Sequence, residues 1–302
     1  MSMLRLCASI LLFCHAYAPA TAYAQAEASP ETRPLPELSS FLARVRDNLK
    51  SDRLLLSQYT YNMKTTTRHL DGQGRAKKTE TREYEVFPSL DEDLTYERLI
   101  SEDGRALGVG KLEEQDSKYK KKADARARKL AEKRKSHPEE QRAREAEENR
   151  KEQETIEEIF KLYEFALLRR EIADGHSAVW IDFTPKAKYR PQTKDGELLK
   201  KLRGRALISE TDYQVIRVDV ELIDDLSFGL GLLARVHKGA KLAFARQKVN
   251  SEIWLPVEAK FAASARALLL KQWRVEATSV YSNYRKFTVS STYDFMGGKP
   301  AQ

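Results

Sequence analysis

The clearest fold signal in the sequence is RALISETDYQVIRVDVELID, residues 205–224. After the turn residues Asp212 and Tyr213, mostly charged residues at odd positions alternate with apolar residues at even positions as far as Leu222. A period of two is typical of an antiparallel strand that buries one face and leaves the other in water. The stretch therefore predicts a hairpin in a half-buried antiparallel sheet.

Apolar patterning on both sides of this hairpin predicts the rest of the sheet and its helices. Residues 59–69, 79–87, 94–101 and 176–186 have the β-branched and aromatic content of strands, and 251–289 gives at least two more. Leu38 to Leu56 repeats apolar residues at three- and four-residue spacing, which indicates an amphipathic helix. Residues 195–204 are interpreted as a short helix closed by Gly204. These elements predict an α+β protein.

A charged segment interrupts this pattern. Lys118 to Lys135 contains ten basic residues and two acidic ones, whereas Glu139 to Glu158 contains nine acidic residues and four basic ones. Ser136 and Glu139 form a capping-box pattern and Pro138 suits a first helical turn, so we expect two helices to meet at 136–138. The basic arm either folds back on the acidic arm or continues as a kinked rod. Both arms lack the apolar residues of a core, and we expect them to project into solvent.

The N-terminus has the features of an export signal. Arg5, a following apolar run and the small residues Ala22 and Ala24 match a signal peptide, residues 1–24, that is cleaved after Ala24. Residues 25–35 then resemble a polar linker. Both cysteines of the chain, Cys7 and Cys14, lie in the leader, so the mature chain is expected to have no disulfide. We expect a periplasmic or secreted protein.

The stretch LSFGLGLLARVHKGAKLAFARQKV, residues 226–249, is among the most apolar in the chain. As two strands around a turn at 237–240, it has one face of large apolar residues and an opposite face of Gly229, Gly231, Ala243 and Ala245. Such a bare face permits close approach by a helix, for which 38–56 is the candidate, or by a bound molecule. The functional interpretation is an apolar cavity for a lipid-like ligand. Its candidate lining residues are Phe228, Leu230, Leu232, Leu242, Phe244, Trp180, Trp254 and Trp273.

Several of these elements occur in a recognisable order. The N-terminal helix, the meander, AVWIDFTPK at 178–186, GRALISETDYQVIRVDVEL at 204–222 and WLPVEAKF at 254–261 resemble the superfamily of periplasmic lipoprotein carriers LolA and LolB. The resemblance implies an unclosed antiparallel β-barrel, or half-barrel, that wraps helices.

Residues 36–112 and 159–296 would form this domain, and 113–158 would be a charged helical insertion. The resemblance also implies an interior that receives acyl chains. It further implies a strand arginine that holds the empty state through backbone hydrogen bonds, and Arg205, Arg217 and Arg235 are the candidates.

Motifs of catalysis are missing from the sequence. No Gly-x-Ser-x-Gly or His-Glu-x-x-His motif occurs, and GRALGVGKLE at 104–113 fails as a phosphate loop. We expect no enzyme, no catalytic residue, no metal and no cofactor, and a lipid or lipoprotein acyl chain as the ligand. The alternative is a sensor or scaffold that contacts a membrane surface or envelope protein through Lys118 to Lys135. Nucleic acid is not expected, because the basic arm has only one aromatic residue, Tyr119, for base stacking.

Overall fold

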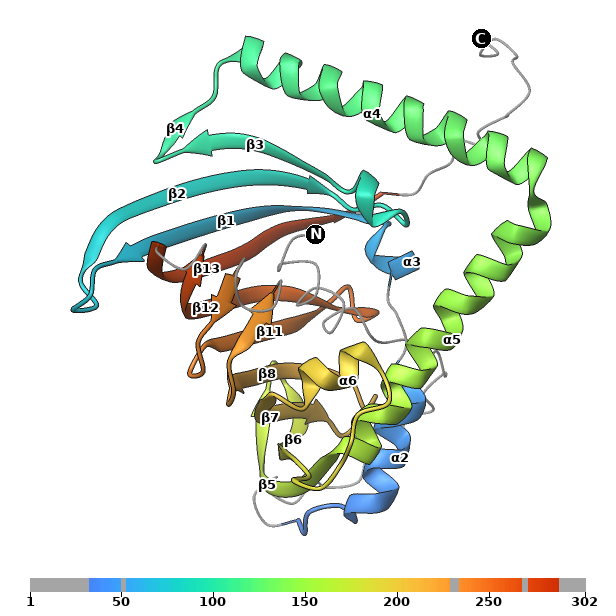
Figure 1. The fold of residues 1–302 in the computed structure, drawn as a ribbon, viewed down its shortest axis with the longest axis vertical. Coiled ribbons are helices and arrows are strands. Elements are labelled where there is room, and N and C mark those ends of the chain that lie inside the picture. The colour runs from blue at the N-terminus through green and yellow to red at the C-terminus, as the bar shows by residue number, and fades with distance from the viewer. Residues whose placement is uncertain (1–32, 50–52, 229–233, 268–270, 288–302) are drawn as a thin grey trace.

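The structure is a computed structural model that describes residues 33–49, 53–228, 234–267 and 271–287. A large antiparallel sheet runs through the molecule, with a few helices beside it (Figure 1). The elements are α2 (Leu38–Asn48), α3 (Arg53–Leu56), β1 (Tyr59–Leu70), β2 (Ala76–Phe87), the 3-10 turn η1 (Glu92–Leu94), β3 (Tyr96–Glu102), β4 (Arg105–Ala106), α4 (Val109–Ser136), α5 (Pro138–Leu162), β5 (Tyr163–Ala173), β6 (His176–Pro185), α6 (Lys194–Leu199), β7 (Leu202–Ser209), β8 (Val215–Leu222), β9 (Leu226–Phe228), β10 (Ala234–Val236), β11 (Lys241–Val249), β12 (Ile253–Ala267) and β13 (Lys271–Lys286).

The strand order of the sheet is β4-β3-β2-β1-β13-β12-β11-β8-β7-β6-β5, with β10 paired to β12 and β9 to β10. Pairing of β1 with β13 places the first long strand beside the last, with Thr65 opposite Ser279. The terminal strands β4 and β5 do not pair with each other, so the sheet stays open. This confirms the predicted α+β class and the unclosed antiparallel sheet.

The hairpin predicted from residues 205–224 is confirmed. Strands β7 and β8 pair from Leu202 opposite Leu222 to Ile208 opposite Val215. A bulge at Ile216 breaks the alternation near the turn, because Leu207 pairs with Arg217 while the next residue, Ile208, pairs with Val215. Tyr213 takes a left-handed backbone conformation with φ of 58°, as a tight connection requires.

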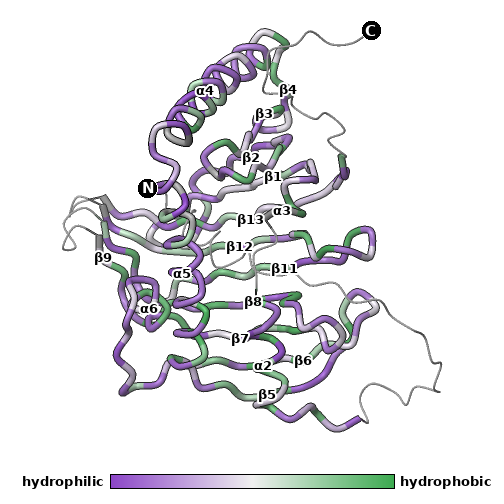
Figure 2. The backbone as a smooth tube through the Cα atoms, turned by 90° about the vertical axis from the view of Figure 1, so that its right-hand side faces the viewer, coloured by the Kyte–Doolittle hydropathy of each residue, from purple (hydrophilic) through white to green (hydrophobic). Residues whose placement is uncertain are grey.

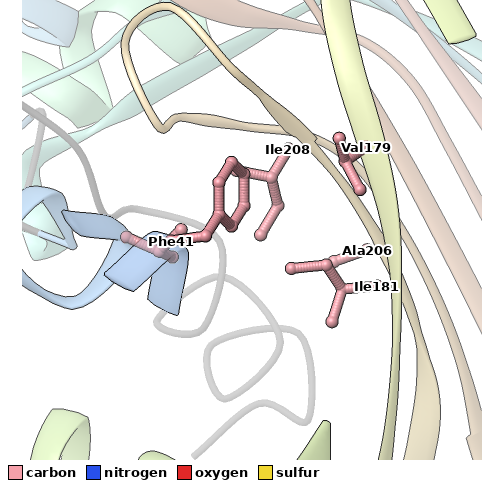
Figure 3. Packing of buried hydrophobic residues seen from close by; sticks show 6 residues of the cluster. Phe41, Val179, Ile181, Ala206 and Ile208 are labelled. Carbon is pink, nitrogen blue, oxygen red and sulfur yellow. The ribbon is translucent and has the colours of Figure 1, made fainter. Parts of the chain in front are cut away.

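The sheet has two unlike faces. On one, Phe41 and Val45 of α2 pack against Val179, Ile181 and Ile208 of β6 and β7 (Figure 3). We call this the helix face, because α3 also packs on it through Tyr59. The opposite face carries no described helix over β7, β8, β11 and β12, and we call it the open face.

Three local predictions differ from the structure. The helix predicted at 38–56 ends at Asn48, because Leu49 has ψ of 75°, and a separate short helix begins at Arg53. Gly204 does not close a helix but lies inside β7, after α6 has ended at Leu199. The capping box does not form, since His137 is the N-cap of α5 but its side chain makes no capping hydrogen bond, and Ser136 Oγ donates within α4 to the Glu132 carbonyl.

The charged helices connect the two edges of the sheet (Figure 1). Helix α4 follows β4 and lies along β3, where the Tyr119 ring stacks on Tyr96 at a centroid distance of 4.2 Å. Gln115 bonds both the N–H and the C=O of Leu99, at 3.1 and 3.0 Å. Because β4 is only two residues long, these bonds use edge groups of β3 that would otherwise face water.

Helix α5 ends at the other edge, where it leads directly into β5. Glu158 is 3% exposed and accepts a hydrogen bond from the Thr193 N–H at 3.1 Å, and Glu157 lies 3.9 Å from Arg46 of α2. The middle of the segment is exposed and hydrophilic (Figure 2). The expected helix junction at 136–138 is confirmed, but both ends of the segment contact the rest of the protein instead of projecting into solvent.

Candidate ligand-binding site

An apolar row crosses the middle of the helix face. Pairing across β8, β11, β12 and β13 places Val220 opposite Leu242, Leu242 opposite Phe261, and Phe261 opposite Ala277. We call these four residues the apolar row. Each is half-buried, unlike the fully covered residues under α2. Apolar side chains that stay partly accessible on a broad sheet face are available to bind an apolar ligand.

A group of tyrosines continues this face onto β1. The ring centroid of Tyr61 lies 5.9 Å from that of Tyr281 and 5.2 Å from that of Tyr284. Glu97 of β3 is on the same face, because it pairs with Val86 and Val86 pairs with Tyr61. We call Tyr61, Tyr281, Tyr284 and Glu97 the tyrosine cluster. Such rings combine an apolar body with a polar tip, which suits the boundary between an acyl chain and its headgroup.

The tyrosine rings of this cluster are half-buried, whereas Glu97 is exposed. Burial raises the pKa of Tyr61 above its ordinary value of 10.0, and the charges of Tyr281 and Glu97 act in the same direction. Desolvation also raises the pKa of Glu97 above its ordinary 4.5, although its side chain is exposed by surface area. This surrounding favours neutral groups and apolar ligands.

The structure does not bring all eight candidate lining residues together. Leu242, Phe244 and Trp273 belong to the helix face, because they pair in register with Phe261, Ala259 and Ala265. The backbone of Phe228 is in β9, opposite Ala234. Leu230 and Leu232 lie outside the described residues.

Trp180 and Trp254 are on the open face, where they form a buried cluster with Ala178, Leu207 and Ile216. The Trp180 indole N–H donates to Glu171 at 2.7 Å and that of Trp254 to Asp212 at 2.9 Å. Both indoles are therefore fully engaged in packing and hydrogen bonding on the face opposite to the apolar row.

Charged groups surround the Trp254 end of this cluster. Asp212 is largely desolvated, which opposes ionisation, but hydrogen bonds from Trp254 and Lys248 leave its pKa below its ordinary value of 3.8. Lys248 Nζ lies 2.9 Å from the Asp212 carboxylate. The pair anchors the β7–β8 turn to β11 and β12, so its role is structural.

The three arginine candidates make other contacts. Arg205 and Arg217 both bond the Asp219 carboxylate on the open face, at 2.9 and 3.1 Å, and Arg235 lies 3.9 Å from Asp225. The strand arginine that does bond a backbone carbonyl is Arg246, whose Nε donates to Val215 O at 2.7 Å. Pairing of β8 with β11 ends at Arg217 and Ala245, so Arg246 satisfies a carbonyl just beyond the ladder.

Sequence reasoning did not assign Tyr61, Glu97 or Phe261 to the site. A signal was present in β1, where Tyr59, Tyr61 and Met63 alternate with Thr60 and other polar residues, and β12 shows Phe261 at the start of an alternating run. The alternation identifies residues of one face, but only the pairing of β1 with β13 places them on the same face as the apolar row.

Neither a metal-ligand cluster nor a helix able to span a membrane occurs among the described residues. In these ranges no group of three or more His, Cys, Asp or Glu side chains is arranged to hold a metal ion. No helix there combines the length and apolar character needed to cross a membrane.

No family model and no curated protein matches this sequence. Among solved structures, a domain from Vibrio parahaemolyticus described as an outer membrane lipoprotein-sorting protein domain has 10% identity over 79% of this chain and 88% of its own, with a TM-score of 0.27. A DUF1329 family protein from Desulfovibrio piger has 12% identity over 84% and 94%, with a TM-score of 0.27. MucB in complex with MucA(peri) has 10% identity over 83% and 100%, with a TM-score of 0.20. Likenesses at this level assign no function, so function must follow from the chain's own residues.

Proposed function

We propose that this protein is an extracytoplasmic binding protein that takes the acyl chain of a lipid or lipoprotein on its helix face, without a covalent step. The observation that carries the proposal is the half-buried apolar row; the tyrosine cluster lies on the same face, where Tyr281 is four residues further along β13 than Ala277. Three interstrand spacings make the row about 14 Å long. Each buried CH2 group contributes about 0.8 kcal/mol, so ten of them would supply up to about 8 kcal/mol before ordering costs.

The proposal is tested by filling the apolar row. Ala277→Phe places a ring between Phe261 and the tyrosine cluster and should weaken binding of a dansyl-labelled undecanoic acid at least tenfold. Thr66→Phe on β1 is the matched control, because Thr66 pairs with Thr278 on the open face. The proposal is contradicted if Ala277→Phe binds the dansyl fatty acid as tightly as the wild type does, or if Ala277→Phe and Thr66→Phe weaken its binding equally. A ligand-free mass in native mass spectrometry of protein purified from its own envelope would also count against it.

A second candidate function is contact with an anionic membrane surface through the basic arm of α4. Lys120, Lys121 and Lys129 are exposed and have no ion pair among the described residues. The acidic arm does not neutralise them, because the recorded ion pairs of its carboxylates within the charged segment are to bases of α5 itself. Each lysine near an anionic leaflet contributes about 1 kcal/mol.

Vesicle sedimentation separates this candidate from the first. The triple variant of Lys120, Lys121 and Lys129 to Gln should lose binding to vesicles that contain phosphatidylglycerol, whereas its binding of the dansyl fatty acid should stay unchanged. Lys64, Lys77 and Lys78 changed to Gln provide a charge-matched control on the sheet. Equal loss in both triple variants would contradict a role for the basic arm.

A further inference from the structure

The open face has a groove of about 840 Å³ that extends from Asp182 on β6 to Thr278 on β13. Its floor follows from the register of β11 and β12, in which Lys241 pairs with Ala262 and Ala243 pairs with Lys260. The small side chains of Ala243 and Ala262, which are diagonal to each other, leave a hollow. Lys241 and Lys260, on the other diagonal, border it. The bare residues at Ala243 therefore do not receive α2, which packs on the opposite, bulky face.

The carboxylates around this hollow are already engaged. Each is bonded by a guanidinium on a neighbouring strand or on its own strand: Asp219 by Arg205 and Arg217, Glu221 by Arg203 at 2.9 Å, and Glu276 by Arg68 at 2.9 Å. Asp182, which accepts from Thr184, lies three strands from Ala243. Arg203, Arg205, Arg217 and Arg68 balance the four carboxylates Asp182, Asp219, Glu221 and Glu276, so the net positive charge beside the hollow is that of Lys241 and Lys260.

The two lysines are the groups most available to a ligand. Lys241 is exposed and forms no ion pair within the described part of the chain, and Lys260 has only Glu258, two residues along its own strand, at 2.7 Å. An exposed pair of this kind contributes little and is easily exchanged. Diagonal positions on adjacent strands lie about 7–8 Å apart at Cα, within reach of one anion held by two long side chains.

We propose that this groove binds a phosphate group, held by the ammonium groups of Lys241 and Lys260 above Ala243 and Ala262. A phosphate carries enough charge for two ammonium groups, and the alanine methyl groups leave it room to approach the sheet. The side chains of the apolar row point to the opposite face, although its four residues also contribute to the lining of the groove.

Calorimetric titration of the protein with inorganic phosphate and with glycerol 3-phosphate tests the proposal at constant ionic strength. Lys241→Gln with Lys260→Gln should weaken binding at least about tenfold, because two charge-assisted hydrogen bonds are lost. Ala243→Val with Ala262→Val should weaken it similarly by filling the hollow, while the melting temperature holds, since β-branched residues suit strands. Lys64→Gln with Lys77→Gln removes two charges elsewhere on the sheet and should leave binding unchanged.

The two probes distinguish the source of the phosphate. Tighter binding of glycerol 3-phosphate supports a lipid headgroup, and equal binding supports free phosphate. No binding of either, or equal losses in the groove variants and the control variant, overturns the site. Ala277→Phe should not change phosphate binding, so failure of the acyl-chain proposal and failure of this one are separate results.

Discussion

Replacing Gly204 by alanine should destabilise the protein, although alanine is the better strand residue by intrinsic propensity. A Cβ atom at this position would lie 2.1 Å from the backbone oxygen of Asp219, 2.9 Å from Phe183 Cζ and 3.0 Å from Val220 Cα. The neighbouring strand β8 would have to move away from β7. Overpacking costs about 1–3 kcal/mol, and one or two weakened ladder bonds cost about 1 kcal/mol each. We expect a loss of about 2–5 kcal/mol.

Thermal unfolding followed by circular dichroism measures this loss, which should lower the melting temperature by about 10 °C for a chain of this size. Gly110→Ala is the control, because nothing lies within 4 Å of its added Cβ and the site is helical, where alanine stabilises. Phe183→Leu should not rescue Gly204→Ala, since the closest obstacle is backbone. A Gly204→Ala protein as stable as the wild type would refute the argument, and full rescue by Phe183→Leu would show that the ring is the obstacle.

Two further predictions concern stability. Glu210, 14% exposed, accepts from Arg170 Nε at 2.7 Å, so Glu210→Gln should cost about 3 kcal/mol in urea titrations. Arg170 lowers the pKa of Glu210 below its ordinary 4.5, so this cost should be complete above that pH and shrink as the pH falls through the lowered value. A loss of stability by Glu210→Gln that stays constant in acid would contradict this prediction. Gln115→Leu should lower stability by about 1–2 kcal/mol and speed amide exchange at Leu99; unchanged exchange would show that the β3 edge is protected in another way.

Local patterns in the sequence predicted most of the strands, because alternation is a property of neighbours along the chain. The β7–β8 hairpin and the meander of β1, β2 and β3 follow from strands that are consecutive in the sequence and joined by short connections. The break between α2 and α3 was missed because the apolar spacing continues through Leu49, while its backbone leaves the helical region.

The identity of the covered face could not be predicted, because it depends on contacts between distant segments. Trp180 shares its face with charged residues of neighbouring strands yet is buried, since Arg205 and Arg217 lay their guanidinium groups over its ring at 4.8 and 5.9 Å. Conversely, Ala243 suggested a docking surface for the N-terminal helix, and that prediction is wrong because Phe41 finds larger partners on the helix face. Similarly, the acyl-chain interpretation placed Trp180 and Leu242 in one lining, but they point to opposite sides.

The charged helices have a mechanical consequence for the sheet. Helix α4 has 28 residues and α5 has 25, so at 1.5 Å per residue they are rigid members of about 42 and 38 Å. The two helices meet at His137, and their far ends are attached to the two edges of the curved sheet, at β4 and β5. Helix length and the angle at His137 therefore limit how far apart the two edges of the sheet can lie, and one added helical turn would lengthen one of the two helices by about 5.4 Å.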